Sequence, residues 1–168
     1  VTEIFHSVTK IELFTLGPPI TSLSQSAGNA GAETKVRGIG LQNTLKSPVV
    51  FEGVGLHSGA QVRMVLRPAA AGHGIWFRRT DIQIGNAMIP ALWDVVERTA
   101  LCTRLVNRSG VTVSTVEHVM AALAGGGIHN ALIEIDGPEV PILDGSAAPF
   151  VDAILGRGIR RLDTPVMA

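Results

Sequence analysis

Apolar and polar residues alternate along several short segments in the middle of the chain, as they do in half-buried strands. The clearest alternation covers residues 62–66 and ends at the Arg-Pro pair of residues 67–68. Other segments of similar length and of apolar, largely β-branched and aromatic content predict strands at 49–51, 75–79, 101–106, 111–113 and 131–135. The Asn-Arg-Ser-Gly sequence at 107–110 is typical of a turn, so we expect the strands on either side of it to form a hairpin.

The period of the apolar residues changes after residue 114. Four apolar residues recur at the spacing i, i+3, i+4, i+7 of one helical stripe: Val116, Val119, Met120 and Leu123. Ser114 and Glu117 have the spacing of a capping box, and the three glycines at 125–127 are expected to end the helix. A second helix is predicted at about 148–155. Together these elements predict an α+β fold: one mostly antiparallel sheet with two helices packed on one face.

The first 43 residues differ in character from the rest of the chain. Residues 17–31 are rich in Gly, Pro, Ser and other small residues, which bury too little apolar area to offset the entropy lost on ordering. We therefore expect a flexible N-terminal extension at 1–43, an ordered domain at 44–160 and a tail at 161–168.

Composition and charge argue against several classes of function. The formal net charge is zero and charged residues make up 17% of the chain, without the clustered Lys and Arg of a nucleic-acid-binding protein. Arg78 and Arg79 are interpreted as solvating the end of a strand. No apolar run reaches the ~18 residues of a membrane span, and the opening residues lack the order of a signal peptide. The single cysteine, Cys102, permits no internal disulfide, so we expect a cytoplasmic protein.

Glu117 and His118 are the strongest candidates for chemistry. Neighbours on a helix are separated by ~100°, so both residues avoid the apolar stripe, and the small Ala121 and Ala122 one turn later leave space beside them. A histidine ligand next to a carboxylate fits a zinc site in which the carboxylate accepts a proton from water. The same pattern also fits a simpler interpretation, in which Glu117 caps the helix and His118 is merely solvated.

Three further segments give less specific signals. The glycine-rich segment 53–59 contains a histidine but lacks the spacing of a dinucleotide-binding loop, and a tight hairpin explains it as well. The acidic segment 136–146 suggests Asp144 as a structural acid near the site, although Asp144 or Ser146 could instead cap the second helix. Residues 99–103 fit either an apolar wall or a buried strand.

Taken in order, these segments resemble the N-terminal domain of UDP-3-O-acyl-N-acetylglucosamine deacetylases. The matching sequences are GVGLHSG at 53–59, LCT at 101–103, STVEH at 114–118 with AALAG at 121–125, and PILDGSAAPF at 141–150. The similarity covers about residues 44–160. It implies a fold of two similar α+β domains that face each other across the active site, of which this chain carries the first.

The resemblance implies hydrolysis of the acetamide of a UDP-linked, 3-O-acylated glucosamine, an early step of lipid A biosynthesis. It implies that His118 is one of two histidine ligands to zinc, completed by an aspartate, and that Glu117 is the general base. It also implies, less directly, that His57, Leu101 and Cys102 lie close to the bound substrate.

The sequence departs from the family pattern in one important respect. The second histidine ligand and the aspartate belong to a His-Lys-x-x-Asp motif of the C-terminal domain, and these 168 residues do not contain it. We therefore expect the C-terminal catalytic domain to be absent, zinc to lack a full ligand set, and the chain to be inactive alone. A fragment, a truncated reading frame and one half of a split protein all stay open. So does a non-catalytic module that binds a sugar nucleotide or a partner domain.

Overall fold

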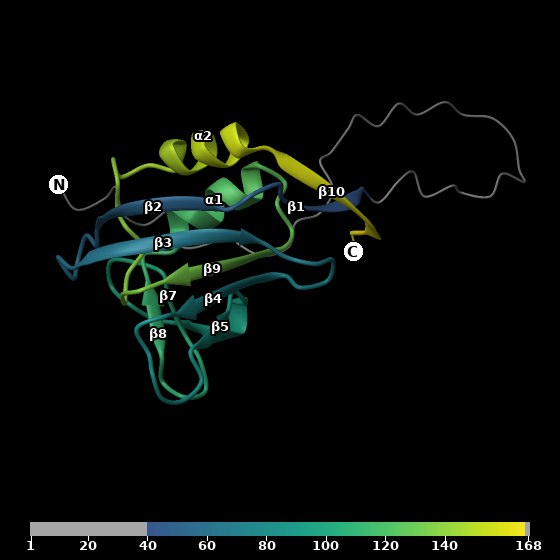
Figure 1. Ribbon diagram of the computed structural model, residues 1–168. Coiled ribbons are helices and arrows are strands. Elements are labelled where there is room, and N and C mark those ends of the chain that lie inside the picture. The colour runs from purple at the N-terminus through teal and green to yellow at the C-terminus, as the bar shows by residue number, and fades with distance from the viewer. Residues whose placement is uncertain (1–39, 167–168) are drawn as a thin grey trace, which may run out of the picture.

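Ten strands, one short 3-10 helix and two α-helices make up residues 40–166, the part of the chain that the computed structural model describes (Figure 1). In chain order they are β1 Leu41–Leu45, β2 Val49–Val54, β3 Gln61–Pro68, β4 Ile75–Arg79, β5 Met88–Pro90, η1 Trp93–Val95, β6 Val96–Glu97, β7 Arg104–Val106, β8 Thr112–Ser114, α1 Glu117–Gly125, β9 Ala131–Ile135, α2 Ala148–Arg157 and β10 Ile159–Pro165. The expected N-terminal extension lies almost entirely outside these residues.

The central sheet has five strands in the order β2-β3-β9-β4-β5, and every neighbouring pair is antiparallel except β4 with β9. Because side chains alternate between the two faces of a sheet, directly opposed residues share a face. Phe51 lies opposite Met64, and Met64 lies opposite Ile135, so these buried side chains form one apolar face. The other face carries ion pairs of Glu134 with Arg67 and Arg78. The sheet is therefore amphipathic, and its apolar face must be covered.

Both helices help to cover that apolar face (Figure 1). The ring of Phe150 in α2 packs on Phe51 of β2, with 4.8 Å between the ring centroids, and both side chains are buried. Helix α1 packs beside α2, and its predicted apolar stripe is buried in the same core. The predicted α+β architecture, with two helices and a mostly antiparallel sheet, is confirmed. The helix boundaries predicted from the glycines are close to those observed.

The predicted capping box at the start of α1 is wrong. Ser114 ends strand β8, and the residue that precedes α1, Val116, makes no side-chain capping hydrogen bond. Between them Thr115 has a φ of 57°, in the left-handed region that β-branched residues rarely adopt. Tertiary contacts of Glu117, described below, replace the local bond that the spacing suggested.

Two smaller sheets complete the structure. Strands β6, β7 and β8 form one of them, and the predicted hairpin of β7 and β8 is confirmed, with the Asn107 side chain accepting the N–H groups of Ser109 and Val111 in the turn. The strand predicted to begin at residue 101 begins only at Arg104, because residues 98–103 form an irregular loop.

Strands β1 and β10 pair antiparallel as a separate two-stranded ribbon. The residues expected to form a tail thus form most of a strand, and β1 begins before residue 44, where the ordered domain was expected to start. Among residues 40–166, no helix is long and apolar enough to cross a membrane.

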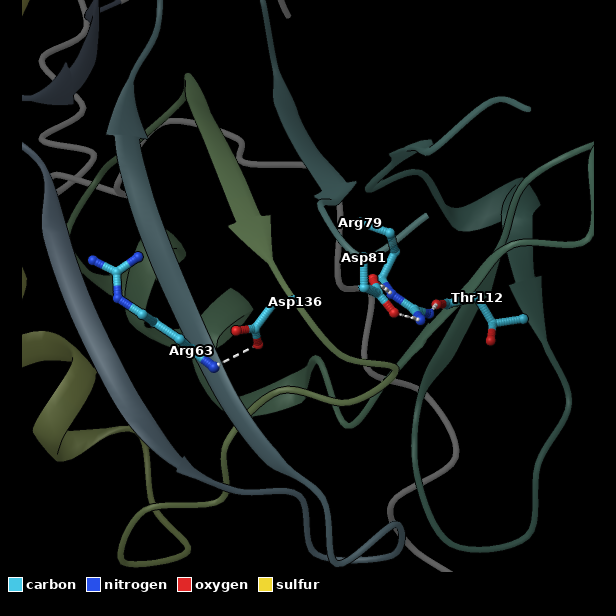
Figure 2. A network of polar contacts seen from close by, with 5 residues as sticks. All are labelled: Arg63, Arg79, Asp81, Thr112 and Asp136. Carbon is cyan, nitrogen blue, oxygen red and sulfur yellow. Dashed lines mark hydrogen bonds and ion pairs between the residues drawn. The ribbon is translucent and has the colours of Figure 1, made fainter. Parts of the chain in front are cut away.

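Arg79, at the end of β4, does not solvate a strand end as the sequence suggested. Its side chain is buried, and Figure 2 shows it forming a bidentate pair with Asp81, at 2.8 and 2.6 Å, and donating to the carbonyl oxygen of Thr112 at 2.7 Å. The hydrogen bonds from Arg79 lower the pKa of the Asp81 carboxyl below its ordinary value. Burial of Asp81 opposes this shift, and the positive charge of Arg79 adds to it. Since Thr112 belongs to β8, this contact ties the central sheet to the strand that leads into α1.

Candidate functional site

An open pocket of about 410 Å³ lies between two loops of the chain. Its lining residues are His57, Ser58, Thr99, Ala100, Leu101, Cys102, Arg104, Ser114, Pro138 and Glu139. The first wall is the turn between β2 and β3, and the second is the loop that precedes β7. The structure therefore brings together His57, Leu101 and Cys102, the three residues that sequence similarity placed near a substrate.

The turn that carries His57 is a tight hairpin, as one of the two interpretations of the glycine-rich segment proposed. The Gly55 N–H donates to the Ala60 carbonyl at 2.9 Å, and the Gly59 N–H donates to the Gly55 carbonyl at 3.0 Å. Gly59 has a φ of 64°, which favours glycine. The turn leaves the His57 side chain exposed at the edge of the pocket.

The opposite loop exposes apolar surface. Leu101 is 80% exposed and Cys102 is half-buried, so neither belongs to the buried strand that was one interpretation of this segment. Thr99 stabilises the loop because its hydroxyl bonds to the Cys102 carbonyl oxygen. This wall thus offers an apolar side chain and a thiol to the pocket.

Glu139 is the acid that lines the pocket, and the sequence did not single it out. The residue is only 2% exposed. It accepts the N–H groups of His57, at 3.1 Å to each oxygen, and of Ser58 at 2.7 Å, as well as the hydroxyl of Thr115 at 2.6 Å. Burial alone would raise its pKa, but the hydroxyl and backbone hydrogen bonds outweigh burial and lower the pKa from 4.5 to about 2. Glu139 is therefore ionised at neutral pH.

This buried carboxylate predicts a specific loss of stability in acid. The folded-state pKa lies below the unfolded one, so the contribution is complete above pH 4.5 and is lost as the pH falls toward about 2. The shift corresponds to a free energy of unfolding on the order of 3 kcal/mol. Urea unfolding between pH 6 and pH 2.5 should show a shallower acid decline in Glu139→Gln than in wild type. The exposed Glu52→Gln should behave as wild type; equal slopes in all three chains would contradict the assignment.

Asp144, the acid proposed from the sequence, is exposed and does not line the pocket. One of its oxygens accepts both the N–H and the hydroxyl of Ser146 at 2.9 Å, and the Ser146 hydroxyl accepts the N–H of Ala148 at 3.1 Å. These contacts organise the start of α2, in keeping with the alternative interpretation of the segment. Glu139 stands in the sequence Pro138-Glu139-Val140-Pro141, between two prolines. This was the feature of the sequence that could have indicated a rigid, buried acid.

Glu117 and His118 occupy the first turn of α1 and are both half-buried. The Oε1 atom of Glu117 accepts the N–H of Thr103 at 2.6 Å, so its side chain is directed toward the loop of Leu101 and Cys102 rather than capping its own helix. Its Oε2 atom is buried and has no hydrogen-bond partner among residues 40–166. One oxygen is therefore held by a backbone N–H, while the other has no partner among these residues.

The expectation that two alanines open space beside this pair holds only in part. Ala121, one turn after Glu117, is exposed, whereas Ala122, one turn after His118, is fully buried. Of the two alanines, only Ala121 therefore lies at the surface, and Ala122 belongs to the core.

The described residues by themselves do not fit a complete zinc site. Within residues 40–166, no group of three or more His, Cys, Asp or Glu side chains could hold a metal ion, and catalytic zinc sites use three protein ligands. His129 is not a spare ligand, because its Nδ1 accepts the Asn43 N–H at 3.0 Å. Burial lowers the pKa of His129, partly opposed by a hydrogen bond with the Gly127 backbone, in keeping with a neutral ring.

Neither Glu117 nor His118 lines the pocket, but Glu117 is bonded to Thr103, which follows the lining residue Cys102. A carboxylate with one oxygen held by a backbone N–H and the other unpartnered is a candidate general base. Comparison with known proteins agrees. Residues 42–168 match the family model of LpxC, described as UDP-3-O-acyl N-acetylglycosamine deacetylase, and the chain belongs to this family.

Individual relatives support the same assignment. The chain is 54% identical over 124 residues to the UDP-3-O-acyl-N-acetylglucosamine deacetylase of Photobacterium profundum, which covers 74% of this chain and 40% of the relative. It is 55% identical over 123 residues to that of Aliivibrio fischeri, covering 73% and 40%, and 56% identical over 124 residues to that of Myxococcus xanthus, covering 74% and 39%. The matched region thus spans about 40% of the length of these curated relatives.

Proposed function

We propose that this chain supplies part of the active site of a zinc-dependent deacetylase that removes the N-acetyl group of UDP-3-O-acyl-N-acetylglucosamine in lipid A biosynthesis. The observation that carries the proposal is the state of Glu117, whose Oε1 is held by the Thr103 N–H and whose Oε2 is buried without a partner. A buried, unpartnered carboxylate oxygen is costly to keep, so its presence favours a role in proton transfer.

In this proposal Glu117 is the general base that accepts a proton from the attacking water at Oε2. The hydrogen bond from Thr103 fixes the direction of that oxygen, which preserves the geometry that proton transfer requires. His118 is proposed as one zinc ligand; residues 40–166 contain no group that could complete the ligand set.

The pocket is proposed to hold the substrate. Leu101 offers exposed apolar surface that suits an acyl chain, while His57 and Ser58 offer polar groups on the opposite wall. Cys102 also belongs to the lining. This division matches an amphipathic substrate better than a purely polar sugar nucleotide.

A chimera tests the proposal. The matching 124 residues of the Myxococcus xanthus relative are replaced by those of this chain, and deacetylation of the family substrate is measured in the chimera, in the relative and in this chain alone. We expect measurable turnover in the chimera, because it carries Glu117 and His118, the residues proposed to act in the reaction. We expect none in this chain alone. A folded, zinc-loaded chimera that binds substrate without hydrolysing it would instead support the non-catalytic binding module.

A further inference from the structure

Glu139 connects two parts of the site that are distant in the sequence. Through its oxygens it holds the backbone of His57 and Ser58, more than 80 residues earlier in the chain, and the hydroxyl of Thr115, which lies 24 residues earlier. The first contact orders one wall of the pocket. The second acts on the residue that comes two positions before Glu117.

Thr115 is the point at which β8 turns into α1. Its φ of 57° is unfavourable for a β-branched residue, so the surrounding contacts must impose this conformation. The Glu139 carboxylate provides one such contact, with a charge-assisted hydrogen bond of 2.6 Å in a fully buried position. The direction in which α1 begins, and with it the position of Glu117 and His118, depends on this turn.

The segment that carries Glu139 is itself held on both sides. The Val140 N–H donates to the Ser114 carbonyl at 3.0 Å, and the Ile142 N–H donates to the Val54 carbonyl at 2.9 Å. Gly55, in the first wall, lets the Glu139 carboxylate approach the turn closely because it has no Cβ. A Cβ at this position would lie 2.5 Å from a Glu139 oxygen and 2.3 Å from the Ser58 hydroxyl. The Glu139 carboxylate is therefore held in place by neighbours on two elements.

We propose that Glu139 is a positioning residue, which couples the His57 wall of the pocket to the start of the helix that bears Glu117 and His118. This inference rests on the proposed function for its catalytic consequence, but the coupling itself is a property of this chain. Together with the Glu117–Thr103 contact to the opposite wall, it ties the start of α1 to both sides of the pocket.

Amide hydrogen exchange on this chain tests the coupling without any activity measurement. Thr115→Val removes the hydroxyl that binds Glu139 and keeps the β-branched shape, whereas Thr115→Ser keeps the hydroxyl. We expect Thr115→Val to accelerate exchange at the His57 and Ser58 amides by about threefold to tenfold, and Thr115→Ser to restore slow exchange. Thr112→Val, the same change three residues earlier, is the matched control.

Exchange at Ile133, in the central strand β9, reports general loss of stability. The coupling is overturned if Thr115→Val changes the His57 and Ser58 amides no more than it changes Ile133, or no more than Thr112→Val does. A larger change at His57 and Ser58 than at Ile133, reversed by Thr115→Ser, supports it.

The catalytic consequence is measured in the chimera. Partial unfolding lowers kcat by reducing the amount of active enzyme and leaves KM unchanged. Loss of positioning is expected to raise KM about threefold or more and to lower kcat in Thr115→Val, with recovery of both in Thr115→Ser. If the chimera is inactive but Thr115→Val accelerates exchange at the His57 and Ser58 amides as expected, the proposed function is rejected and the positioning role is retained. If the chimera is active but Thr115→Val changes neither the exchange at those amides nor KM, the positioning role is rejected and the proposed function is retained.

Discussion

Glu117→Gln in the chimera is expected to lower kcat by about 10²–10⁴-fold, the usual contribution of a general base. Glutamine has nearly the same shape as glutamate, and its carbonyl oxygen can still accept the Thr103 N–H, so the contact that orients the side chain is preserved. What the substitution removes is the capacity of the buried second oxygen to take up a proton. Steady-state kinetics and thermal unfolding are measured on the same preparations.

The matched control is Glu134→Gln. Glu134 lies on the charged outer face of the central sheet, where it pairs with Arg67 and Arg78, so its loss should leave kcat near that of the parent. Thermal unfolding of Glu117→Gln within a few degrees of the parent would show that the fold is intact. Wild-type turnover in folded Glu117→Gln would remove Glu117 from the chemistry, whatever the family resemblance implies.

Phe150→Ala is expected to lower the free energy of unfolding of this chain by about 3–5 kcal/mol. The Phe150 side chain is fully buried, and its ring lies 4.8 Å from that of Phe51, so its removal leaves a cavity between α2 and the apolar face of the central sheet. The core is shared by both helices, and therefore it cannot close the gap without moving one of them. The expected fall in Tm is about 10–20 °C.

Leu155→Ala is the matched control for this prediction. Leu155 belongs to the same helix, but its side chain is 55% exposed, so less apolar area is lost and no closed cavity forms. Guanidinium unfolding of both variants gives the two free energies. A loss below about 1 kcal/mol in Phe150→Ala would mean that α2 is not part of the cooperative core.

The elements with a strong periodic pattern could be predicted from the sequence because their cause is local. Alternation predicted β3 within a few residues, and the apolar stripe predicted α1, because burying one face of a strand or helix requires that spacing. The hairpin of β7 and β8 followed from its turn residues. Strand β10 could not be predicted in this way, because its seven residues are mostly exposed and are held by pairing with β1.

The candidate site shows the same difference between features with a local cause and features that depend on distant contacts. Residue types and order were enough to identify the family and to bring out the segments of His57 and of Leu101 and Cys102, which line the pocket. They also made Glu117 and His118 candidates, which stay a prediction. The orientation of Glu117 depended on an N–H at Thr103, 14 residues away, which outcompeted the local capping bond. A contact between residues so far apart produces no periodic pattern in the sequence.

What the sequence alone determined was thus the fold class, the two helices and the segments that form the pocket walls, because hydrophobic period and turn chemistry are encoded over a few residues. Only the tertiary structure decided that Glu139, and not Asp144, is buried and lines the pocket. Its role comes from the convergence of Ser58, Thr115 and the rigid turn around it, which are far apart in the chain. A carboxylate becomes buried and ionised only where such donors meet, and that meeting is a property of the folded chain.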